Sequence, residues 1–219
     1  MRYAYNMSEV DTSASALADR ELECTDGKFV PFDIIHGWNP RLCLECDSQW
    51  STFNLKLFKS LDEKNLSEDE SGRILSTLQL EDSGWNWFQK SLQLRGSEYE
   101  WFYLYADGKP QGMCLIYHPK KSEFDEGDIF YVEYLAAAPW NRSSALHERE
   151  YKGVGSVLLR AALNYAIGIL NLRPGFSLHS LPQATGYYER LRMVRFDTLN
   201  KGRLVYFELP EAAVGGLLK

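Results

Sequence analysis

The chain has 219 residues, of which 45% are hydrophobic and 25% are charged, a composition typical of a folded globular protein. Its net charge of −6 argues against general nucleic-acid binding, which depends on a positively charged surface. No apolar run reaches the roughly 18 residues of a membrane-spanning helix and the first residues do not resemble a signal peptide, so we expect a cytoplasmic protein without a membrane partner.

The first part of the chain is weakly patterned. Residues 1–28 are polar and aperiodic, and we expect an N-terminal extension of uncertain order followed by one domain over residues 29–219. A short strand is predicted from Phe29 to Ile35, and the sequence from His36 to Pro40 indicates a turn. Apolar spacing and start signals then predict three helices, over Trp50–Leu61, Ser71–Leu80 and Glu81–Leu92.

Cys43 and Cys46 form a lone CxxC sequence within this part of the chain. A zinc site normally needs a second pair of ligands at suitable spacing, and no second cluster follows. A thioredoxin-like motif would follow a strand and open a helix, which is not the clear context here. We therefore expect two reduced thiols and no metal site.

The middle of the chain has the texture of a β-sheet. Tyr99 to Ala106 is an aromatic, strand-like run, and Asp107-Gly108 is a strong hairpin turn that leads into a second strand over Gln111–Tyr117. Asp128 to Ala138 is the strongest predicted strand, and Pro139 ends it. The large aromatic residues here and just before are expected to pack in the core or at its edge: Trp85, Trp87, Trp101, Phe102 and Tyr103.

The last part returns to alternating helices and strands. A helix with a wide apolar face is predicted over Gly153–Leu170, followed by a strand over Phe176–Leu181 and a short helix over Pro182–Leu191. A final hairpin joins Val194–Thr198 to Arg203–Leu209. The strand–helix–strand order implies a parallel crossover, while the hairpins supply antiparallel neighbours, so we expect an α/β (α+β) fold with one mixed sheet flanked by helices.

The segment that carries chemistry is Tyr151 to Ser156 (YKGVGS), between a buried strand and the long helix. Glycines at a helix start let a ligand approach the backbone, and the free N–H groups and helix dipole there favour an anion. Lys152 adds a positive charge, so a phosphate or pyrophosphate is the expected ligand. Neither a Walker loop nor a complete dinucleotide-binding fingerprint is present, and a helix start that only needs flexible backbone is the structural alternative.

The run from Asp128 to Phe196 resembles the GNAT (Gcn5-related N-acetyltransferase) superfamily. Gly153-x-Gly155 matches the end of the family motif [Q/R]-x-x-G-x-[G/A], and YVEYLAAAP resembles the strand that precedes it. Ala184 to Leu191 (ATGYYERL) resembles the family box A-x-x-F-Y-E-x-L. Departures are Glu150 at the Gln or Arg position, a longer connection over residues 140–152, and Arg192 in place of a glycine.

This resemblance implies a mostly antiparallel sheet with a central parallel pair of strands that splay apart to hold acetyl-CoA. The backbone of Leu135, Ala136 and Ala137 would bind the pantetheine arm. The amides from Lys152 to Ser156, through Gly153, Val154 and Gly155, would bind the pyrophosphate. The implied reaction is direct attack of a primary amine on the thioester, by an acyl-CoA-dependent N-acyltransferase of a small molecule or peptide.

Two side chains are candidate catalytic groups. Glu133 lies in mid-strand, where a charge is costly unless it faces a cleft, and it is our candidate base; a Glu that faces solvent is the alternative. Tyr188 aligns with the tyrosine of the second box and is the implied general acid for the thiolate, the alternative being a packed aromatic residue. His179 is expected to be a satisfied core histidine rather than a base.

Two other functions are compatible with the sequence. A non-catalytic acyl-CoA-binding or regulatory module could retain the same fold, and an acyltransferase acting on a macromolecule could share it. The negative net charge argues against a nucleic acid as the acceptor in the second of these alternatives. Neither the acceptor amine nor the oligomeric state is specified by any pattern in the chain.

Overall fold

The computed structural model describes residues 21–64 and 66–218, so most of the predicted N-terminal extension, residues 1–20, lies outside the described residues. A seven-stranded sheet has the order β3-β4-β5-β6-β7-β9-β8, and β1 and β2 form a separate two-stranded sheet. The strands are β1 (Glu21–Glu23), β2 (Phe29–Pro31), β3 (Asp33–His36), β4 (Tyr99–Ala106), β5 (Lys109–Lys121), β6 (Asp128–Ala137), β7 (Phe176–Ser180), β8 (Val194–Arg195) and β9 (Val205–Leu209).

Only one strand pair in the large sheet is parallel. β6 pairs in parallel with β7 through the helix that connects them, and every other neighbouring pair is antiparallel. The mixed, mostly antiparallel sheet with a central parallel pair is therefore confirmed. It follows from a strand–helix–strand connection set among hairpins.

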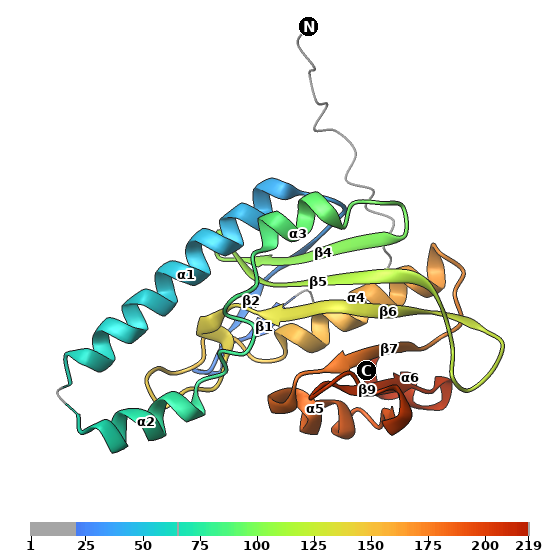
Figure 1. The fold of residues 1–219 in the computed structure, drawn as a ribbon. Helices are drawn as coiled ribbons and strands as arrows, with labels where there is room; N and C mark the ends of the chain where they lie inside the picture. Colours follow the sequence, from blue (N-terminus) through green and yellow to red (C-terminus); the bar gives the residue numbers. More distant parts are fainter. Residues whose placement is uncertain (1–20, 65, 219) are drawn as a thin grey trace, which may run out of the picture.

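Helices cover both faces of this sheet (Figure 1). α1 and α3 pack on one face and α4 packs on the other, where the apolar side of α4 meets the inward-facing residues of β4, β5 and β6. The helices are α1 (Pro40–Asp62), α2 (Glu68–Thr77), α3 (Trp87–Gln93), α4 (Val154–Gly168), α5 (Thr185–Arg190) and α6 (Glu211–Leu217). Within the described residues, no helix is long and apolar enough to cross a bilayer.

The aromatic residues form the core as predicted. Trp101, Phe102 and Tyr103 alternate between the two faces of β4, with Trp101 and Tyr103 in the cluster under α1 and Phe102 in the cluster under α4. All three are essentially inaccessible to solvent. Trp87 is buried in the same cluster as Trp101 and Tyr103, while Trp85 is only partly buried. This period of two is what a strand buried on both faces requires.

Several boundaries differ from the predicted ones for local reasons. The predicted strand over Phe29–Ile35 is two strands, because β2 pairs with β1 while β3 pairs with β4. α1 begins ten residues before the predicted start at Trp50, at Pro40, because the Asn39 side chain accepts a hydrogen bond from the Leu42 amide and proline suits the first helical turn. The predicted turn at His36–Pro40 thus ends in a helix cap.

The third predicted helix also begins later than expected. Residues 81–84 form a turn, and α3 starts at Trp87. Two side chains fix this start: Asn86 accepts from the Gln89 amide, and the Asp47 carboxylate on α1 accepts from the amides of Trp87 and Phe88. The late start therefore depends on a contact with α1 that is distant in sequence.

Candidate functional site

The two central parallel strands separate along their length. The pairing of β6 with β7 covers only Phe130–Val132 and Phe176–Leu178, although β6 continues to Ala137 and β7 to Ser180. Beyond these residues β6 keeps its other neighbour, β5, up to the pair Gly112 and Ala137. One edge of β6 is thus open from Glu133 onward, which is the splayed arrangement expected from the sequence.

The backbone groups on this open edge alternate. The Ala138 amide donates to the Gln111 carbonyl on β5, and in an antiparallel ladder the neighbours two residues apart point the same way. Ala136 therefore faces β5, while Leu135 and Ala137 direct their N–H and C=O groups to the open side. The Ala137 carbonyl already accepts two hydrogen bonds from the Arg142 guanidinium, at 2.9 and 2.7 Å. Of the three residues predicted to bind pantetheine, Leu135 has the most accessible backbone groups.

The start of α4 differs from the starts of the first three helices. α1, α2 and α3 are each capped by a side chain, from Asn39, Ser67 and Asn86. α4 begins after Gly153, which has a left-handed backbone (φ 74°), and within the described residues no side chain caps its first turn. The amides of Val154, Gly155 and Ser156 belong to that first turn and have no intrahelical acceptor.

Gly155 connects this turn to the open strand edge. A Cβ atom at Gly155 would lie 3.8 Å from the Leu135 side chain, with no other nearby heavy atom within 4 Å. The space in front of the helix start is therefore open and borders β6. Ser156 faces α5 with its side chain, since its hydroxyl lies 2.8 Å from the Tyr187 hydroxyl.

Two charged residues before the turn are held by partners outside it. The Lys152 amide donates to the Glu23 carbonyl at 3.0 Å, and the Lys152 ammonium lies 2.5 Å from the Glu23 carboxylate. Glu150, which stands where the family motif has Gln or Arg, pairs with Lys109 at 2.8 Å. The Lys152 amide is therefore not free in this structure, and the acidic charge of Glu150 is neutralised by a residue of the β4–β5 hairpin.

Residues 21–28, assigned above to the extension, hold the glycine turn from outside. β1 contains Glu23, and an isolated bridge joins Cys24 to Tyr151. The Tyr151 amide in turn donates to the buried Asn141 side chain. The long connection after β6 is thus fixed from both sides rather than being a solvated loop throughout.

Glu133 sits at an irregularity in β6. In the ladder with β5, Leu115 pairs with Tyr134 and Ile116 with Val132, so Glu133 is the extra residue of a β-bulge. Its side chain is half-buried, and burial raises the pKa of the Glu133 carboxyl, while Lys201 and Lys90 partly offset this by favouring the charged form. The bulge breaks the regular alternation of β6 at the first residue beyond its pairing with β7.

Tyr188 is buried on α5, with its ring centroid 5.1 Å from that of Tyr187 and 6.1 Å from that of Phe207. Burial raises the pKa of the Tyr188 phenol far above its usual value, with smaller contributions from Tyr187 and Cys114. The phenol therefore stays protonated at neutral pH. Since Cys114 pairs with Leu135, Tyr188 lies close to the same stretch of β6 as the open backbone groups.

His179 has both ring nitrogens engaged. Its Nδ1 lies 2.7 Å from the Tyr131 hydroxyl and its Nε2 lies 2.9 Å from the Leu199 carbonyl. A carbonyl only accepts, so Nε2 carries the proton and Nδ1 accepts from Tyr131. Burial lowers the pKa of the imidazole, which favours this neutral form and agrees with the predicted structural role.

The CxxC pair lies inside α1. Cys43 and Cys46 are buried free thiols, and burial raises the pKa of Cys43 to about 11 and that of Cys46 further. Within the described residues, no group of three or more His, Cys, Asp or Glu is arranged to hold a metal ion. Cys43 Sγ lies 3.3 Å from the Tyr103 hydroxyl, and both thiols pack as small side chains under β4.

Arg142, in the long connection after β6, and a pair of aromatic rings beside Lys90 of α3 are further parts of the site region. Arg142 binds the Asp82 carboxylate with two nitrogens, the shorter contact being 2.5 Å, and so ties the turn before α3 to the end of β6. Trp85, Lys90 and Tyr134 meet beside β6, and the charge of Lys90 reaches Glu133. For the aromatic rings beside Lys90, the signal in the sequence was the high density of aromatic residues around residue 85.

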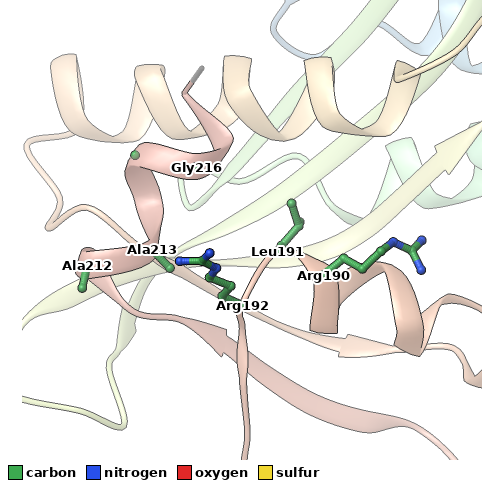
Figure 2. Close-up of a pocket in the computed structure, with 7 residues that line it drawn as sticks. Arg190, Leu191, Arg192, Ala212, Ala213 and Gly216 are labelled. Carbon is green, nitrogen blue, oxygen red and sulfur yellow. The ribbon is translucent and has the colours of Figure 1, made fainter.

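A cavity of about 420 Å³ lies apart from these groups, beside α5 and α6. Its lining includes Arg190, Leu191, Arg192 and Ala213, and Figure 2 shows the two guanidinium groups pointing in opposite directions. Arg192 has a left-handed backbone (φ 61°) and so retains the turn for which the family uses glycine. None of the predicted site residues lines this cavity.

Comparison with solved structures finds chains of similar architecture. N-acetyltransferase PseH from Campylobacter jejuni is 18% identical, with 82% of this chain and 98% of that chain covered and a TM-score of 0.42. A putative GNAT-family acetyltransferase from Desulfovibrio desulfuricans is 11% identical, with 82% and 99% covered and a TM-score of 0.48. PseH in complex with acetyl coenzyme A is 15% identical, with 67% and 94% covered and a TM-score of 0.40.

No family model and no curated protein sequence matches this chain. With identities and TM-scores this low, donor, acceptor and reaction have to be argued from the geometry of the chain itself. The sheet has the features that the resemblance to the GNAT superfamily implied: it is mostly antiparallel, with a single central parallel pair that diverges after Val132.

Proposed function

We propose that this protein is an N-acetyltransferase that transfers the acetyl group of acetyl-CoA to a primary amine of a small molecule or peptide. One observation carries the proposal: the open edge of β6 and the uncapped start of α4 are adjacent, with Gly155 facing the Leu135 side chain across open space. The open strand edge suits an extended ligand with amide groups, and the uncapped helix start suits a pyrophosphate.

Donor binding would use the backbone. Amides of Gly153, Val154, Gly155 and Ser156 supply donors for the pyrophosphate, and the Leu135 carbonyl supplies an acceptor for the pantetheine arm. Because Lys152 already gives its amide and its ammonium to Glu23, we assign it to holding the turn rather than to direct phosphate contact. Ala136 faces β5 and contributes its position rather than a backbone hydrogen bond.

Chemistry would proceed by direct attack. The acceptor is a neutral amine at the moment of attack, and Glu133 takes its proton directly or through water. The amine nitrogen bonds to the thioester carbon, and the Leu135 amide would donate to the oxygen that becomes negative. The carbon–sulfur bond then breaks, the thiolate takes the proton of Tyr188, and the products are an amide and CoA.

The first test is donor binding by calorimetry with Gly155→Trp. The backbone at Gly155 is compatible with a side chain and the space beside it is open, so we expect a folded variant whose indole fills the donor site. Affinity for acetyl-CoA should fall at least about tenfold, which is ~1.4 kcal/mol.

Gly72→Trp is the matched control, because Gly72 is also a helical glycine with open space around it, far along the chain on α2. It should bind acetyl-CoA like the original protein. Equal weakening in both variants, or no binding by the original protein, would remove the assignment of the donor site.

A second test concerns Tyr188→Phe. We expect kcat with a chosen amine to fall roughly ten- to hundredfold while the affinity for acetyl-CoA is retained, the low end of general-acid effects because a thiolate is already a good leaving group. Tyr187→Phe on the same helix removes a hydroxyl of the same kind and should have the smaller effect on kcat. Tight donor binding with no turnover of any amine by the original protein would favour the non-catalytic acyl-CoA-binding module instead.

A further inference from the structure

Lys90 on α3 has an unusual environment for a surface lysine. Its ammonium nitrogen lies 3.8 Å from the centre of the Tyr134 ring and 5.6 Å from the centre of the Trp85 ring. The two rings meet edge to face, with centroids 4.8 Å apart. A positive charge over the faces of aromatic rings is attracted by their quadrupoles, so the pair forms a half-cage around a primary ammonium group.

The half-cage lies beside the groups assigned above to catalysis. Tyr134 is the residue between Glu133 and Leu135, and its side chain lies in the cluster on the α1 and α3 face of the sheet. Lys90 is also close enough to Glu133 for its charge to favour the ionised carboxyl. A primary amine, the proposed base and the proposed donor strand are therefore brought together from two elements far apart in sequence.

Lys90 also has no carboxylate partner among the described residues, unlike two other lysines of the site region. Among the ion pairs of residues 21–64 and 66–218, Lys109 and Lys152 each have a carboxylate partner within 3 Å, whereas Lys90 has none. An aromatic face holds an ammonium group less firmly than a carboxylate does, and it holds the neutral amine less firmly still. Deprotonation would therefore release the side chain from the half-cage.

We propose that Lys90 is a substrate of its own chain: the ε-amine is acetylated by acetyl-CoA bound along β6. This rests on the proposed function. The neutral Nζ attacks the thioester carbon, a carbon–nitrogen bond forms and the carbon–sulfur bond breaks. Glu133 receives the amine proton, and the thiolate takes the proton of Tyr188 and leaves as CoA. The product, an acetamide, has no charge, so acetylation ends the cation–π contact with Tyr134.

The test is a time course of the whole protein with acetyl-CoA, followed by peptide mapping with mass spectrometry. Lys56 and Lys59 are exposed lysines on α1 and report the uncatalysed reaction in the same sample. We expect Lys90 to be acetylated at least about tenfold faster than either, because a positioned amine has a high effective concentration. The rate per chain should not change when the protein is diluted.

Two variants separate the possible outcomes. Gly155→Trp should bring Lys90 down to the rate of Lys56, and Lys90→Arg, which keeps the positive charge, should remove the fast site without lowering acetyl-CoA binding. If the original protein binds acetyl-CoA but Lys90 reacts no faster than Lys56, or only in proportion to protein concentration, self-acetylation is wrong and the proposed function stands. If calorimetry detects no acetyl-CoA binding, both fall.

Discussion

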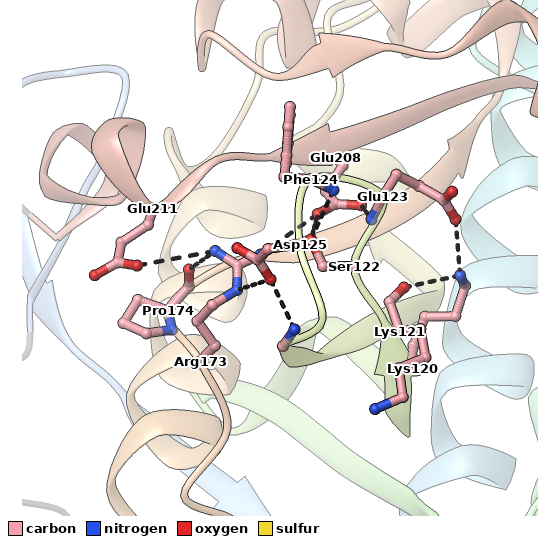
Figure 3. A network of polar contacts seen from close by, with 11 residues as sticks. Lys120, Lys121, Ser122, Glu123, Phe124, Asp125, Arg173, Pro174, Glu208 and Glu211 are labelled. Atoms are coloured by element: carbon pink, nitrogen blue, oxygen red, sulfur yellow. Dashed lines mark hydrogen bonds and ion pairs between the residues drawn. The ribbon is translucent and has the colours of Figure 1, made fainter.

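Arg173→Met is expected to lower the free energy of unfolding by about 3–5 kcal/mol, the cost of leaving a buried charge without its partner. Glu208 on β9 is fully buried, and one Arg173 nitrogen lies 3.5 Å from its carboxylate. Ser122 and the Glu123 amide also donate to this carboxylate, and Arg173 donates to Ser122 at 2.8 Å. Figure 3 shows these contacts converging from the β5–β6 loop, the connection between α4 and β7, and β9.

The guanidinium is the group that balances this charge. Of its other acidic contacts, Asp125 at 3.2 Å is about half exposed and Glu211 at 3.9 Å is mostly exposed, so both can be solvated without Arg173. The carboxylate of Glu208 cannot be solvated when Arg173 is removed, because it has no access to water. Thermal or denaturant unfolding followed by circular dichroism measures the expected loss.

Lys121→Met is the matched control, since it removes a cation at the end of β5, next to the loop that contains Ser122 and Glu123. Its pair with Asp128, at 2.8 Å, is exposed, and the expected change is under about 1 kcal/mol. Adding Glu208→Gln to Arg173→Met should recover part of the loss, because the neutral amide is less costly to bury. Equal losses for Arg173→Met and Lys121→Met would show that burial of Glu208 does not set the energy.

This network also bears on the proposed donor site. It joins the residues just before β6 and β7, at the end where the two strands are still paired. Divergence of the strands begins a few residues later, after Val132. The ion-pair network therefore holds the paired ends of β6 and β7 together, just before the point where the two strands diverge.

Strong local patterns predicted much of the fold. β4 has the predicted bounds, and Asp107 and Gly108 both have positive φ values, 50° and 71°, as the hairpin turn requires. β6 and α4 were predicted within two residues at each end, since a strand ended by proline and a helix with a wide apolar face are unambiguous signals. The parallel pairing of β6 with β7 followed from their connection.

Features that depend on distant contacts could not be predicted. β1 forms because it pairs with β2. The ion pair of Glu23 with Lys152 joins residues at the two ends of a long stretch of the sequence, so no local pattern indicates it. α6 contains two glycines and little helical signal, and it forms where Val214 and Leu217 pack on the core. The bulge at Glu133 is set by the register of β5, which no pattern within β6 reveals.

The sequence indicated which backbone segments form the candidate site, but it did not indicate which backbone groups in those segments are already hydrogen-bonded. Gly153 and Gly155 could be proposed from the sequence because glycines at a helix start let a ligand approach the backbone, and the resemblance favoured this over a start that only needs flexible backbone. Whether an amide is free is decided by neighbours far along the chain, which is why Lys152 and Ala137 turned out to be engaged. The aromatic half-cage needed α3 and β6 to be placed side by side before its geometry was visible.

Glu133→Gln is expected to lower kcat with an amine substrate by about 10²–10⁴-fold, the usual contribution of a general base. Glutamine has nearly the same shape and cannot take up a proton, so donor affinity should be unchanged. The variant should also be no less stable than the original above the pKa of the carboxyl. The folded protein raises that pKa, so ionising Glu133 opposes folding as pH rises, and glutamine removes this cost.

A pH profile distinguishes loss of a base from loss of packing. In the original protein, kcat/KM should rise as pH increases through the raised pKa of Glu133, well below the region near ~10 where a typical lysine-like amine loses its proton. In Glu133→Gln this lower step should disappear, while the upper step remains. Glu98→Gln replaces an exposed carboxylate just before β4 and should keep both steps. If the lower step persists in Glu133→Gln, another group accepts the proton, and Glu133 serves only to position the strand at its bulge.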